Sequence, residues 1–337
     1  MPSTIKDVAR KAGVSSATVS RALSGKPHVR QAVIDQVREA ALELDFHPSR
    51  VARSLRAQKT TIIGLIISDI LNPFFTTLVR AVEDSASRNE YGVFLCNSDE
   101  SVEKEMAYIE LLQAENVAGV LITPTQENDN PSRRLFEDRI PIVAVDRCML
   151  DVPVDTVLAD NFSGSYSAVD HLIQQGHTRI AIVAAQPNRT TGRERLAGYR
   201  QALADHNIPF CDELVYTGIP NRLTGRLYAK EITQSPIKPT AIFCGNNLLT
   251  MGVLGYLKEA GCNIPEDYAL VSFDDMEWYT MTSPTITAVR QPVYELGRQA
   301  ADLLFERING SVSPVKEIVL ETQLVVRQSS TSARRIV

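Results

Sequence analysis

Between residues 61 and 308, short apolar runs alternate with amphipathic helical patterns, and this alternation constrains the fold more than any other feature of the chain. Runs as apolar as residues 61–67 are typical of strands buried on both faces of a sheet. Strands that alternate with helices predict an α/β fold of doubly wound parallel sheets. The apolar runs are 61–67, 91–96, 118–122, 140–145, 179–184, 240–244 and 268–273, and the helical patterns are about 74–89, 101–115, 161–175, 192–206, 222–234, 247–260 and 293–308.

The number of these units predicts two lobes, with a boundary near residue 160. The late strands near 285–290 and 317–326 are expected to cross between the lobes. We therefore expect an amino-terminal lobe of about 61–160 plus 291–320 and a carboxy-terminal lobe of about 161–290 plus 321–330.

Residues 4–23 predict two short helices joined by a turn. Thr4, followed three residues later by Asp7, is typical of a capped helix start. Gly13 and Val14 would turn the chain, and Ser15 would cap a second helix. The pair is either an ordinary helical hairpin or a helix-turn-helix, whose second helix enters the DNA major groove. The outward face of that helix would carry Ser16, Ala17, Ser20 and Arg21.

Charge is distributed unevenly along the chain. Residues 1–59 contain eleven lysines and arginines against five acidic residues, a net charge of +6, whereas the whole chain carries −5. The remainder is therefore strongly acidic. A basic segment that coincides with the helical pair favours nucleic acid as its partner over an ordinary solvated surface.

A third helix is predicted over about 30–44, and residues 1–46 would form a small helical domain. Residues 49–57 contain good helix formers, but a segment this short is not helical alone in water, where about 12–15 residues are marginal. We expect this segment to be disordered until something packs on it. It belongs to a hinge and linker over 47–60.

Composition excludes several other classes of protein. A chain of 337 residues suits two or three domains, and its five cysteines are scattered without a CxxC pair, which favours a reducing cytoplasm over a disulfide frame or zinc ribbon. We expect no signal peptide, no membrane span and no metal site, because no long apolar run is present and the histidines lack ligand spacing.

Polar residues follow the predicted strands at their carboxyl ends, where open parallel sheets bind ligands. Such residues often only form turns, and for any single one the turn is the favoured interpretation. The Asp146-Arg147 pair together with Asp274 and Phe74-Phe75 favours a hydroxyl-rich ligand, which requires bidentate polar partners and aromatic faces. The other strand-end residues are Asp69, Asn72, Asn97, Ser98, Thr123, Pro124, Gly245, Asn246, Asn247 and Asp275.

Distinctive motifs lie along nearly the whole chain: in the head at residues 5–9, 12–15 and 18–21, in the hinge at 50–55, and in the body at 63–65, 72–75, 176–177, 198–199, 273–275 and 291–292. Together these motifs resemble those of the lactose/galactose repressor family. The two-lobed body is also similar to periplasmic sugar-binding proteins.

The resemblance implies that the head and hinge contact DNA. Arg21 matches a base-contacting position, and arginine to guanine is the commonest specific pairing. Leu55 matches a hinge leucine that wedges into the minor groove. The full set of predicted DNA contacts is Thr4, Ser15, Ser16, Ala17, Thr18, Ser20, Arg21, His28, Ser49, Arg50, Ala52, Arg53, Leu55 and Arg56.

The resemblance also implies an effector-binding and dimerisation core over 61–337. Three features depart from the family pattern or stand apart from it. Arg30 replaces the usual Ser or Thr helix cap, and Asn247 replaces the usual aspartate of an Asn-Asp pair, which leaves the role of Asn247 in ligand binding open. Trp278 would either stack on the ligand or anchor the lobe surface. The tail has no leucine heptads for tetramer formation. The predicted effector contacts are Asn72, Phe74, Phe75, Asp146, Arg147, Arg193, Asn246, Asp274, Trp278 and Gln291.

The predicted function is a cytoplasmic, homodimeric DNA-binding regulator, most simply a repressor of carbohydrate-utilisation genes. It would bind a pseudo-palindromic operator, and a sugar or sugar acid between the lobes would control it. The alternative is a transport-type sugar-binding protein, which the basic head argues against. An enzyme is not expected, because the chain contains no GxSxG, HExxH, P-loop or GxGxxG signature, and no cofactor is expected. Arg147 and Arg193 hint at a sugar acid, although arginines also bind neutral pentoses.

Overall fold

The computed structural model describes residues 3–23, 29–46 and 60–331, which belong to two compact units, Met1–Thr60 and Thr61–Val337. The first unit contains the helices α1 (Ile5–Lys11), α2 (Ser16–Leu23) and α3 (Gln31–Glu43). Val8, Val19 and Val37, one from each helix, are fully buried against one another with several alanines. The predicted helical head is therefore confirmed, and its core is small because it consists mainly of valine and alanine.

Local hydrogen bonds explain where the head helices begin. The Asp7 carboxylate accepts hydrogen bonds from the Thr4 backbone N–H at 3.0 Å and from the Thr4 hydroxyl at 2.6 Å. Ser15 Oγ accepts from the Thr18 backbone N–H at 3.1 Å, which is the predicted cap of the second helix. Gly13 connects the two helices with φ of +62°, a left-handed conformation that glycine adopts without strain. Arg30 precedes α3 without a side-chain cap.

The second unit contains two six-stranded sheets, each the centre of one lobe. The first sheet has the order β11-β5-β4-β3-β1-β2 and is parallel throughout. The second has the order β12-β10-β9-β8-β6-β7 and is parallel except for the antiparallel β10–β12 pair. The strands are β1 (Ile62–Ile67), β2 (Gly92–Asn97), β3 (Val120–Ile122), β4 (Ile142–Val145), β5 (Asp155–Ala159), β6 (Ile180–Ala185), β7 (Val215–Gly218), β8 (Ala241–Cys244), β9 (Ala269–Phe273), β10 (Thr287–Arg290), β11 (Glu317–Leu320) and β12 (Gln323–Val325).

Helices cover both faces of each sheet, as a doubly wound fold requires. In the first lobe, α5 and α12 pack on one face and α6 and α7 on the other. In the second lobe, α8 and α9 cover one face and α10 and α11 the other. The helices are α5 (Pro73–Arg88), α6 (Val102–Ala114), α7 (Arg133–Glu137), α8 (Asn161–Gln174), α9 (Thr190–Asp205), α10 (Arg222–Gln234), α11 (Asn247–Glu259) and α12 (Val293–Ile308), with short 3₁₀ turns η1 (Asp212–Leu214), η2 (Glu277–Thr280) and η3 (Gln328–Ser330).

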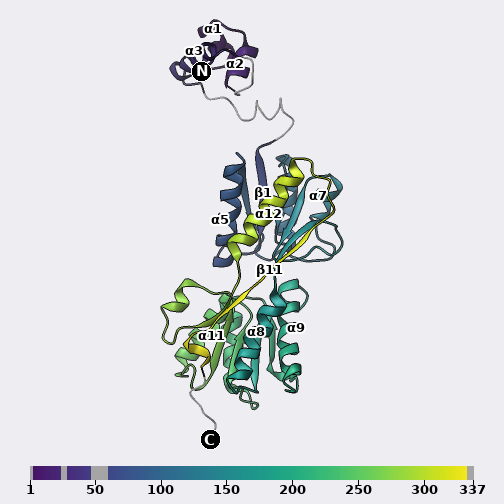
Figure 1. Cartoon of the computed structure of the whole chain (residues 1–337), viewed down its shortest axis with the longest axis vertical. Coiled ribbons are helices and arrows are strands. Elements are labelled where there is room, and N and C mark those ends of the chain that lie inside the picture. The colour runs from purple at the N-terminus through teal and green to yellow at the C-terminus, as the bar shows by residue number, and fades with distance from the viewer. Residues whose placement is uncertain (1–2, 24–28, 47–59, 332–337) are drawn as a thin grey trace. The chain divides into compact units, whose positions relative to one another are not determined.

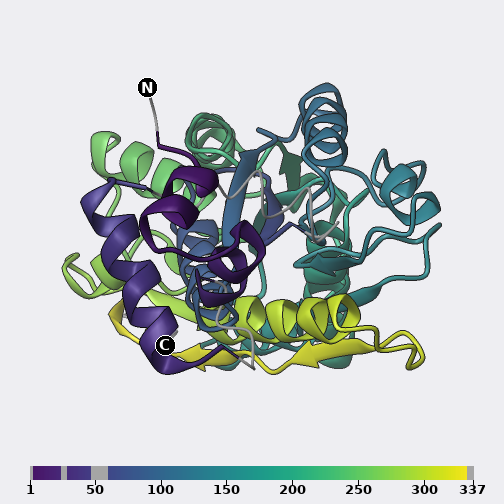
Figure 2. The ribbon, with the colours of Figure 1, turned by 90° about the horizontal axis from the view of Figure 1, so that it is seen from above.

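The chain passes between the lobes after β5, after β10 and again between β11 and β12. Segments far apart in sequence therefore share a lobe. The yellow-green α12 and yellow β11 lie with the blue α5 and β1 in Figure 1, and Figure 2 shows α12 beside the same blue elements from above. A hydrogen bond joins the crossover after β5 to the crossover after β11: the Asp160 N–H donates to the Leu320 carbonyl at 2.8 Å.

Two strands of the body were not predicted, namely β5 and β7. β5 begins at Asp155, which interrupts any apolar run, yet this carboxylate is buried because Arg307 and the Lys316 backbone N–H donate to it at 2.8 Å. β7 carries the polar Tyr216 and Thr217 because it is the last strand of its sheet and is only half buried. Both strands depend on tertiary partners rather than on local hydrophobicity.

Candidate functional site

A cavity of about 400 Å³ lies where the carboxyl ends of the strands of both lobes meet. This is the predicted position for a ligand in open parallel sheets, and the volume is within the range of small-molecule sites. The first lobe lines it with Ser68, Asp69, Asn72, Phe74, Phe75, Asp99, Glu100, Asp146 and Arg147. The second lobe adds Ala185, Gln186, Arg189, Thr191, Arg195, Gly218, Ile219, Pro220, Asn221, Gly245, Asn246, Leu248 and Asp274, and Gln291 follows β10 at a crossover.

Eight of the ten predicted effector contacts line this cavity: Asn72, Phe74, Phe75, Asp146, Arg147, Asn246, Asp274 and Gln291. The other two, Arg193 and Trp278, lie outside its lining. Arg193 is half exposed and forms an ion pair with Glu127 at 2.9 Å. Trp278 packs edge to face on Tyr279 with ring centroids 4.4 Å apart, at the margin of the second lobe's core. The structure thus places these two residues away from the cavity lining, and their contact with a ligand stays a prediction.

Arg195 lines the cavity in place of Arg193. Its Nε donates to Asn161 Oδ1 at 2.8 Å, its Nη1 donates to the Gly245 carbonyl, and its guanidinium lies 3.7 Å from the Phe273 ring centroid. Helical periodicity could have found this residue, because Arg195 precedes the buried Tyr199 by four positions and therefore shares its face. Arg193 projects from a different face of α9.

Two asparagines place helix starts at the rim of the cavity. Asn72 Oδ1 caps α5 by accepting from the Phe74 N–H at 3.0 Å, and Asn246 Oδ1 caps α11 by accepting from the Leu249 N–H at 2.8 Å. Asn247, whose role the sequence left uncertain, is not a lining residue. Its Nδ2 instead donates to Asn72 Oδ1 at 2.9 Å and so joins the two lobes.

Asp146 and Asp274 occupy equivalent places in the two lobes. Each follows a buried strand directly, and each has a left-handed backbone with φ of 71° and 72° respectively. Such a conformation is strained for a residue other than glycine and often marks a functional site. Burial raises the pKa of Asp146 to about 6, against the opposing effect of Arg147. Asp274 Oδ1 accepts from Gln291 Nε2 at 2.5 Å.

Arg147 is the most extensively bonded side chain of the cavity. Its Nη1 and Nη2 donate to the two Glu100 carboxylate oxygens at 2.9 and 2.7 Å, and Nη1 also donates to the Pro124 carbonyl at 3.2 Å. Glu100 also pairs with Arg189 of the second lobe at 2.6 Å. Burial works against ionisation of Glu100, but the two arginines outweigh it and lower the pKa of this carboxyl group. Neither Glu100 nor Arg189 was predicted from the sequence as a ligand contact.

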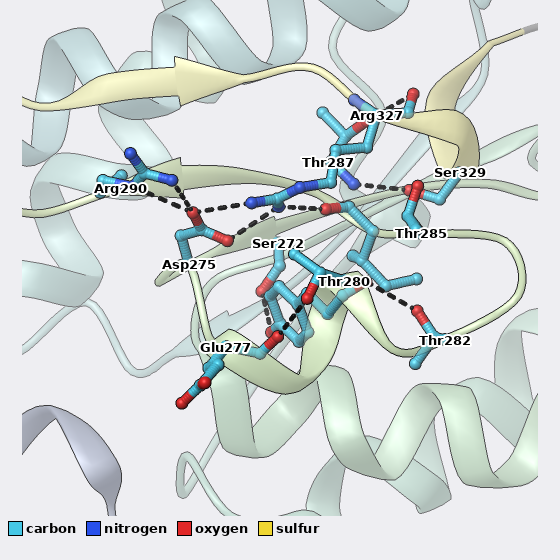
Figure 3. A network of polar contacts seen from close by, with 12 residues as sticks. Ser272, Asp275, Glu277, Thr280, Thr282, Thr285, Thr287, Arg290, Arg327 and Ser329 are labelled. Carbon is cyan, nitrogen blue, oxygen red and sulfur yellow. Dashed lines mark hydrogen bonds and ion pairs between the residues drawn. The ribbon is translucent and has the colours of Figure 1, made fainter.

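The aspartate after Asp274 has a structural role. The Asp275 carboxylate accepts from Arg290 at 2.7 Å and from Arg327 at 2.8 Å, and Figure 3 shows it between these two arginines. Arg327 also donates to the Ile286 carbonyl at 2.6 Å. Burial opposes ionisation of Asp275, but these hydrogen bonds lower its pKa. The network joins the ends of β9 and β10 to the segment after β12.

In the head, α2 has the predicted two faces. Val19 and Ala22 are buried, whereas Ala17 and Arg21 are exposed and Ser16 and Ser20 are half buried. The Thr18 hydroxyl forms a hydrogen bond with Ser15 Oγ at 2.9 Å, and the Thr4 hydroxyl is bonded to Asp7. The remaining predicted DNA contacts, His28, Ser49, Arg50, Ala52, Arg53, Leu55 and Arg56, lie outside the described residues.

The described residues include neither a metal-binding cluster nor a membrane-spanning helix. Over residues 3–23, 29–46 and 60–331, no group of three or more histidine, cysteine, aspartate or glutamate side chains has an arrangement that could hold a metal ion. In the same part of the chain, no helix has both the length and the apolar character needed to cross a membrane.

A helix-turn-helix head followed by a two-lobed α/β body with a polar cavity defines a ligand-responsive DNA-binding regulator. Residues 4–49 match the model of bacterial regulatory proteins of the lacI family, and residues 169–330 match that of the periplasmic binding protein-like domain. The chain is 38% identical to the probable HTH-type transcriptional regulator EndR of Paenibacillus polymyxa, over 92% of each chain. The protein belongs to the lacI family of bacterial transcriptional regulators.

Solved structures agree with this assignment. The Lac repressor dimer bound to operator and the anti-inducer ONPF superimposes with a TM-score of 0.88 at 26% identity, covering 99% of this chain and 100% of that one. The transcriptional regulator CelR in complex with cellobiose superimposes with a TM-score of 0.74 at 31% identity, covering 97% and 99%. The family and fold expected from the sequence motifs are confirmed, and the transport-protein alternative is set aside because the lacI head is present.

Proposed function

We propose that the protein represses carbohydrate-utilisation genes, and that a sugar or sugar acid bound in the cavity controls its affinity for operator DNA. The observation that carries this proposal is the pair of carboxylates, Asp146 and Asp274, that the two lobes contribute to one cavity. A carboxylate accepts hydrogen bonds from two hydroxyl groups, and Phe74 and Phe75 add apolar surface for the C–H face of a sugar ring. The structure of the related regulator CelR contains cellobiose, in agreement with this ligand class.

The head supplies the DNA-binding part of the proposal. We assign residues 1–46 to the DNA-binding domain, 47–60 to the hinge and 61–337 to the effector-binding and dimerisation core. A homodimer would place two α2 helices on the half-sites of a pseudo-palindromic operator, because operator symmetry mirrors the two-fold symmetry of a dimer. The Lac repressor dimer bound to operator supports this arrangement. Arg21, exposed on α2, is the proposed base contact.

Contacts between the lobes provide a route by which a ligand affects the DNA-binding part. Glu100 and Arg189, Asn72 and Asn247, and the Cys148 N–H with Thr190 Oγ1 each connect one lobe to the other, the last at 3.0 Å. A ligand that bridges the lobes changes the balance among these contacts and hence the angle between the lobes. In a dimer, that angle sets the spacing of the two heads. Allosteric coupling of about 1–3 kcal/mol is typical of such a linkage.

The same cavity argues against catalysis as the function. Glu100 is paired with Arg147 and Arg189, and the Arg195 guanidinium donates to Asn161 and to the Gly245 carbonyl, so the arginines of the cavity already have partners. We therefore propose that the protein is not an enzyme and that it acts in the cytoplasm on operator DNA.

The test begins with the full-length protein and rounds of selection from random DNA duplexes. We expect the selection to yield a pseudo-palindromic site. The affinity for this site, measured by fluorescence anisotropy, should fall as the salt concentration rises. The slope of log K against log salt should be roughly −0.9 for each phosphate that the protein neutralises. A panel of sugars and sugar acids should contain a member that changes this affinity several-fold. A protein without sequence preference, or one whose DNA affinity no panel member changes, would contradict the proposal.

A further inference from the structure

The charge balance of the cavity distinguishes between a neutral sugar and an anionic sugar acid as the effector. Five carboxylate side chains and three guanidinium groups line it, so the described lining carries an excess of negative charge. An anionic ligand binds where cationic side chains have no other partner, because a buried charge needs a counter-charge. An anionic effector therefore requires that Arg147, Arg189 or Arg195 be available to a ligand.

Glu100 already occupies two of these arginines. Both terminal nitrogens of Arg147 donate to its carboxylate at 2.9 and 2.7 Å, a bidentate geometry that is also the preferred one for a carboxylate ligand. The other arginine, Arg189, pairs with the same carboxylate at 2.6 Å. Glu100 thus takes the place that the acid group of a sugar acid would otherwise occupy.

Arg195 is engaged in a different way. Its Nε and Nη1 donate to Asn161 and to the Gly245 carbonyl, and the planar group stacks on Phe273. Its positive charge is balanced by Asp274 and Asp146, which are its strongest electrostatic neighbours. An added anion at this arginine would lie close to two carboxylates, which repel it.

Two buried polar atoms of cavity-lining residues have no hydrogen-bond partner in the described part of the chain, and a ligand hydroxyl group could bind to both. Arg147 Nε is a buried donor and Gln291 Oε1 a buried acceptor, and neither has a hydrogen-bond partner among the described residues. A hydroxyl both donates and accepts, whereas a carboxylate or phosphate oxygen only accepts at neutral pH. A ligand rich in hydroxyls can satisfy both atoms at once.

We propose that the effector is a neutral, hydroxyl-rich sugar, and that Glu100 determines this specificity by occupying Arg147 and Arg189 so that sugar acids and sugar phosphates are excluded. The inference rests on the proposed function of the cavity and defines its ligand class more narrowly. It reverses the hint that the arginines alone gave from the sequence. Exclusion of the wrong ligand by an unfavourable charge is a common source of specificity.

The experiment compares neutral sugars with their charged counterparts on the full-length protein. Thermal shift and calorimetry would use glucose, galactose, xylose, ribose and cellobiose against glucuronate, galacturonate, gluconate, glucose 6-phosphate and ribose 5-phosphate. We expect at least one neutral sugar to bind, with its charged counterparts weaker by about tenfold or more. A charged compound that binds more tightly than its neutral counterpart overturns the inference and leaves the proposed function intact.

The Glu100→Gln variant tests the assigned residue. Because the variant frees two arginines, it should bind charged sugars relatively better, and the ratio of neutral to charged affinity should fall by about tenfold. Glu103→Gln is the matched control, since it removes the same charge from an exposed position on α6 outside the cavity and should keep the wild-type ratio. An unchanged ratio in Glu100→Gln overturns the role of Glu100. A panel in which no compound binds the wild type overturns the sugar-controlled function as well.

Discussion

The carboxylates of Asp274 and Asp275 belong to consecutive residues but have different partners. Asp274 lines the cavity and accepts a hydrogen bond from Gln291 at 2.5 Å. Asp275 accepts hydrogen bonds from Arg290 and Arg327 in a network away from the cavity lining (Figure 3). The end of β9 therefore carries one side chain available to a ligand and one that stabilises the second lobe.

Asp274→Asn should weaken effector binding with little effect on operator binding. Hydrogen bonds to a charged group contribute about 1.5–3 kcal/mol, so the loss of the carboxylate should raise the effector Kd by roughly 10- to 100-fold. Calorimetry with the active sugar and anisotropy with operator DNA measure the two properties separately. Unchanged effector affinity would remove Asp274 from the site.

Asp275→Asn is the matched change at the neighbouring position, and it should act on stability instead. Removing one partner of a buried ion pair leaves the other charge uncompensated, and we expect a loss of about 3 kcal/mol because Arg327 is largely buried while Arg290 is half exposed. Urea unfolding measures this loss, and effector Kd should be close to that of the wild type. A variant as stable as the wild type would show that the network in Figure 3 contributes little to folding.

Arg21→Ala should reduce discrimination at one base pair of each half-site. Arg21 is exposed on the outer face of α2, and a bidentate arginine–guanine contact contributes about 1–3 kcal/mol of discrimination. Binding to operators mutated one base pair at a time would locate the effect. Arg80→Ala, which removes an exposed arginine from the body, is the control and should not change the profile. Equal weakening on every sequence would instead make Arg21 a phosphate contact.

Much of the body could be predicted because its strands are buried on both faces and their sequences are continuously apolar. Ile62–Ile67 is such a strand, and the polar residues that follow these strands line the cavity. β5 could not be predicted, because the charge of Asp155 is compensated by Arg307, a residue distant in the sequence.

The residues that determine specificity were harder to predict. Asp99 and Glu100 both adopt left-handed backbone conformations, with φ of 49° and 59°, where Glu100 turns into the cavity, and its partner Arg147 is 47 positions away in the sequence. The apolar pattern of the strand that ends at Asn97 indicates neither the left-handed turn nor the distant partner. In contrast, the place of Arg195 in the cavity lining follows from the periodicity of α9, because Arg195 lies on the same helical face as the buried Tyr199 and Arg193 does not.

Protonation of Asp146 should have opposite effects on effector binding and on the stability of the free protein. Its pKa in the folded protein is raised to about 6 by burial, from an ordinary value of 3.8. Between these two values the folded state binds the proton more tightly than the unfolded state. The contribution of Asp146 to stability therefore falls as pH rises from about 4 to 6 and stays low above pH 6. A sugar that donates hydroxyls to this carboxylate requires it ionised, so effector affinity should fall as pH decreases below about 6.

Asp146→Asn separates this group from the other carboxylates that titrate in the same range. Calorimetry at pH 7 and pH 5 should show effector binding weaken in the wild type, whereas the variant should bind weakly at both pH values with a smaller change. Urea unfolding at pH 4 and pH 6 should show that the stability of the variant relative to the wild type increases with pH, because the variant lacks a carboxylate that is costly to ionise when buried. If wild-type affinity for the sugar is the same at pH 5 and pH 7, the Asp146 carboxylate does not contact the effector.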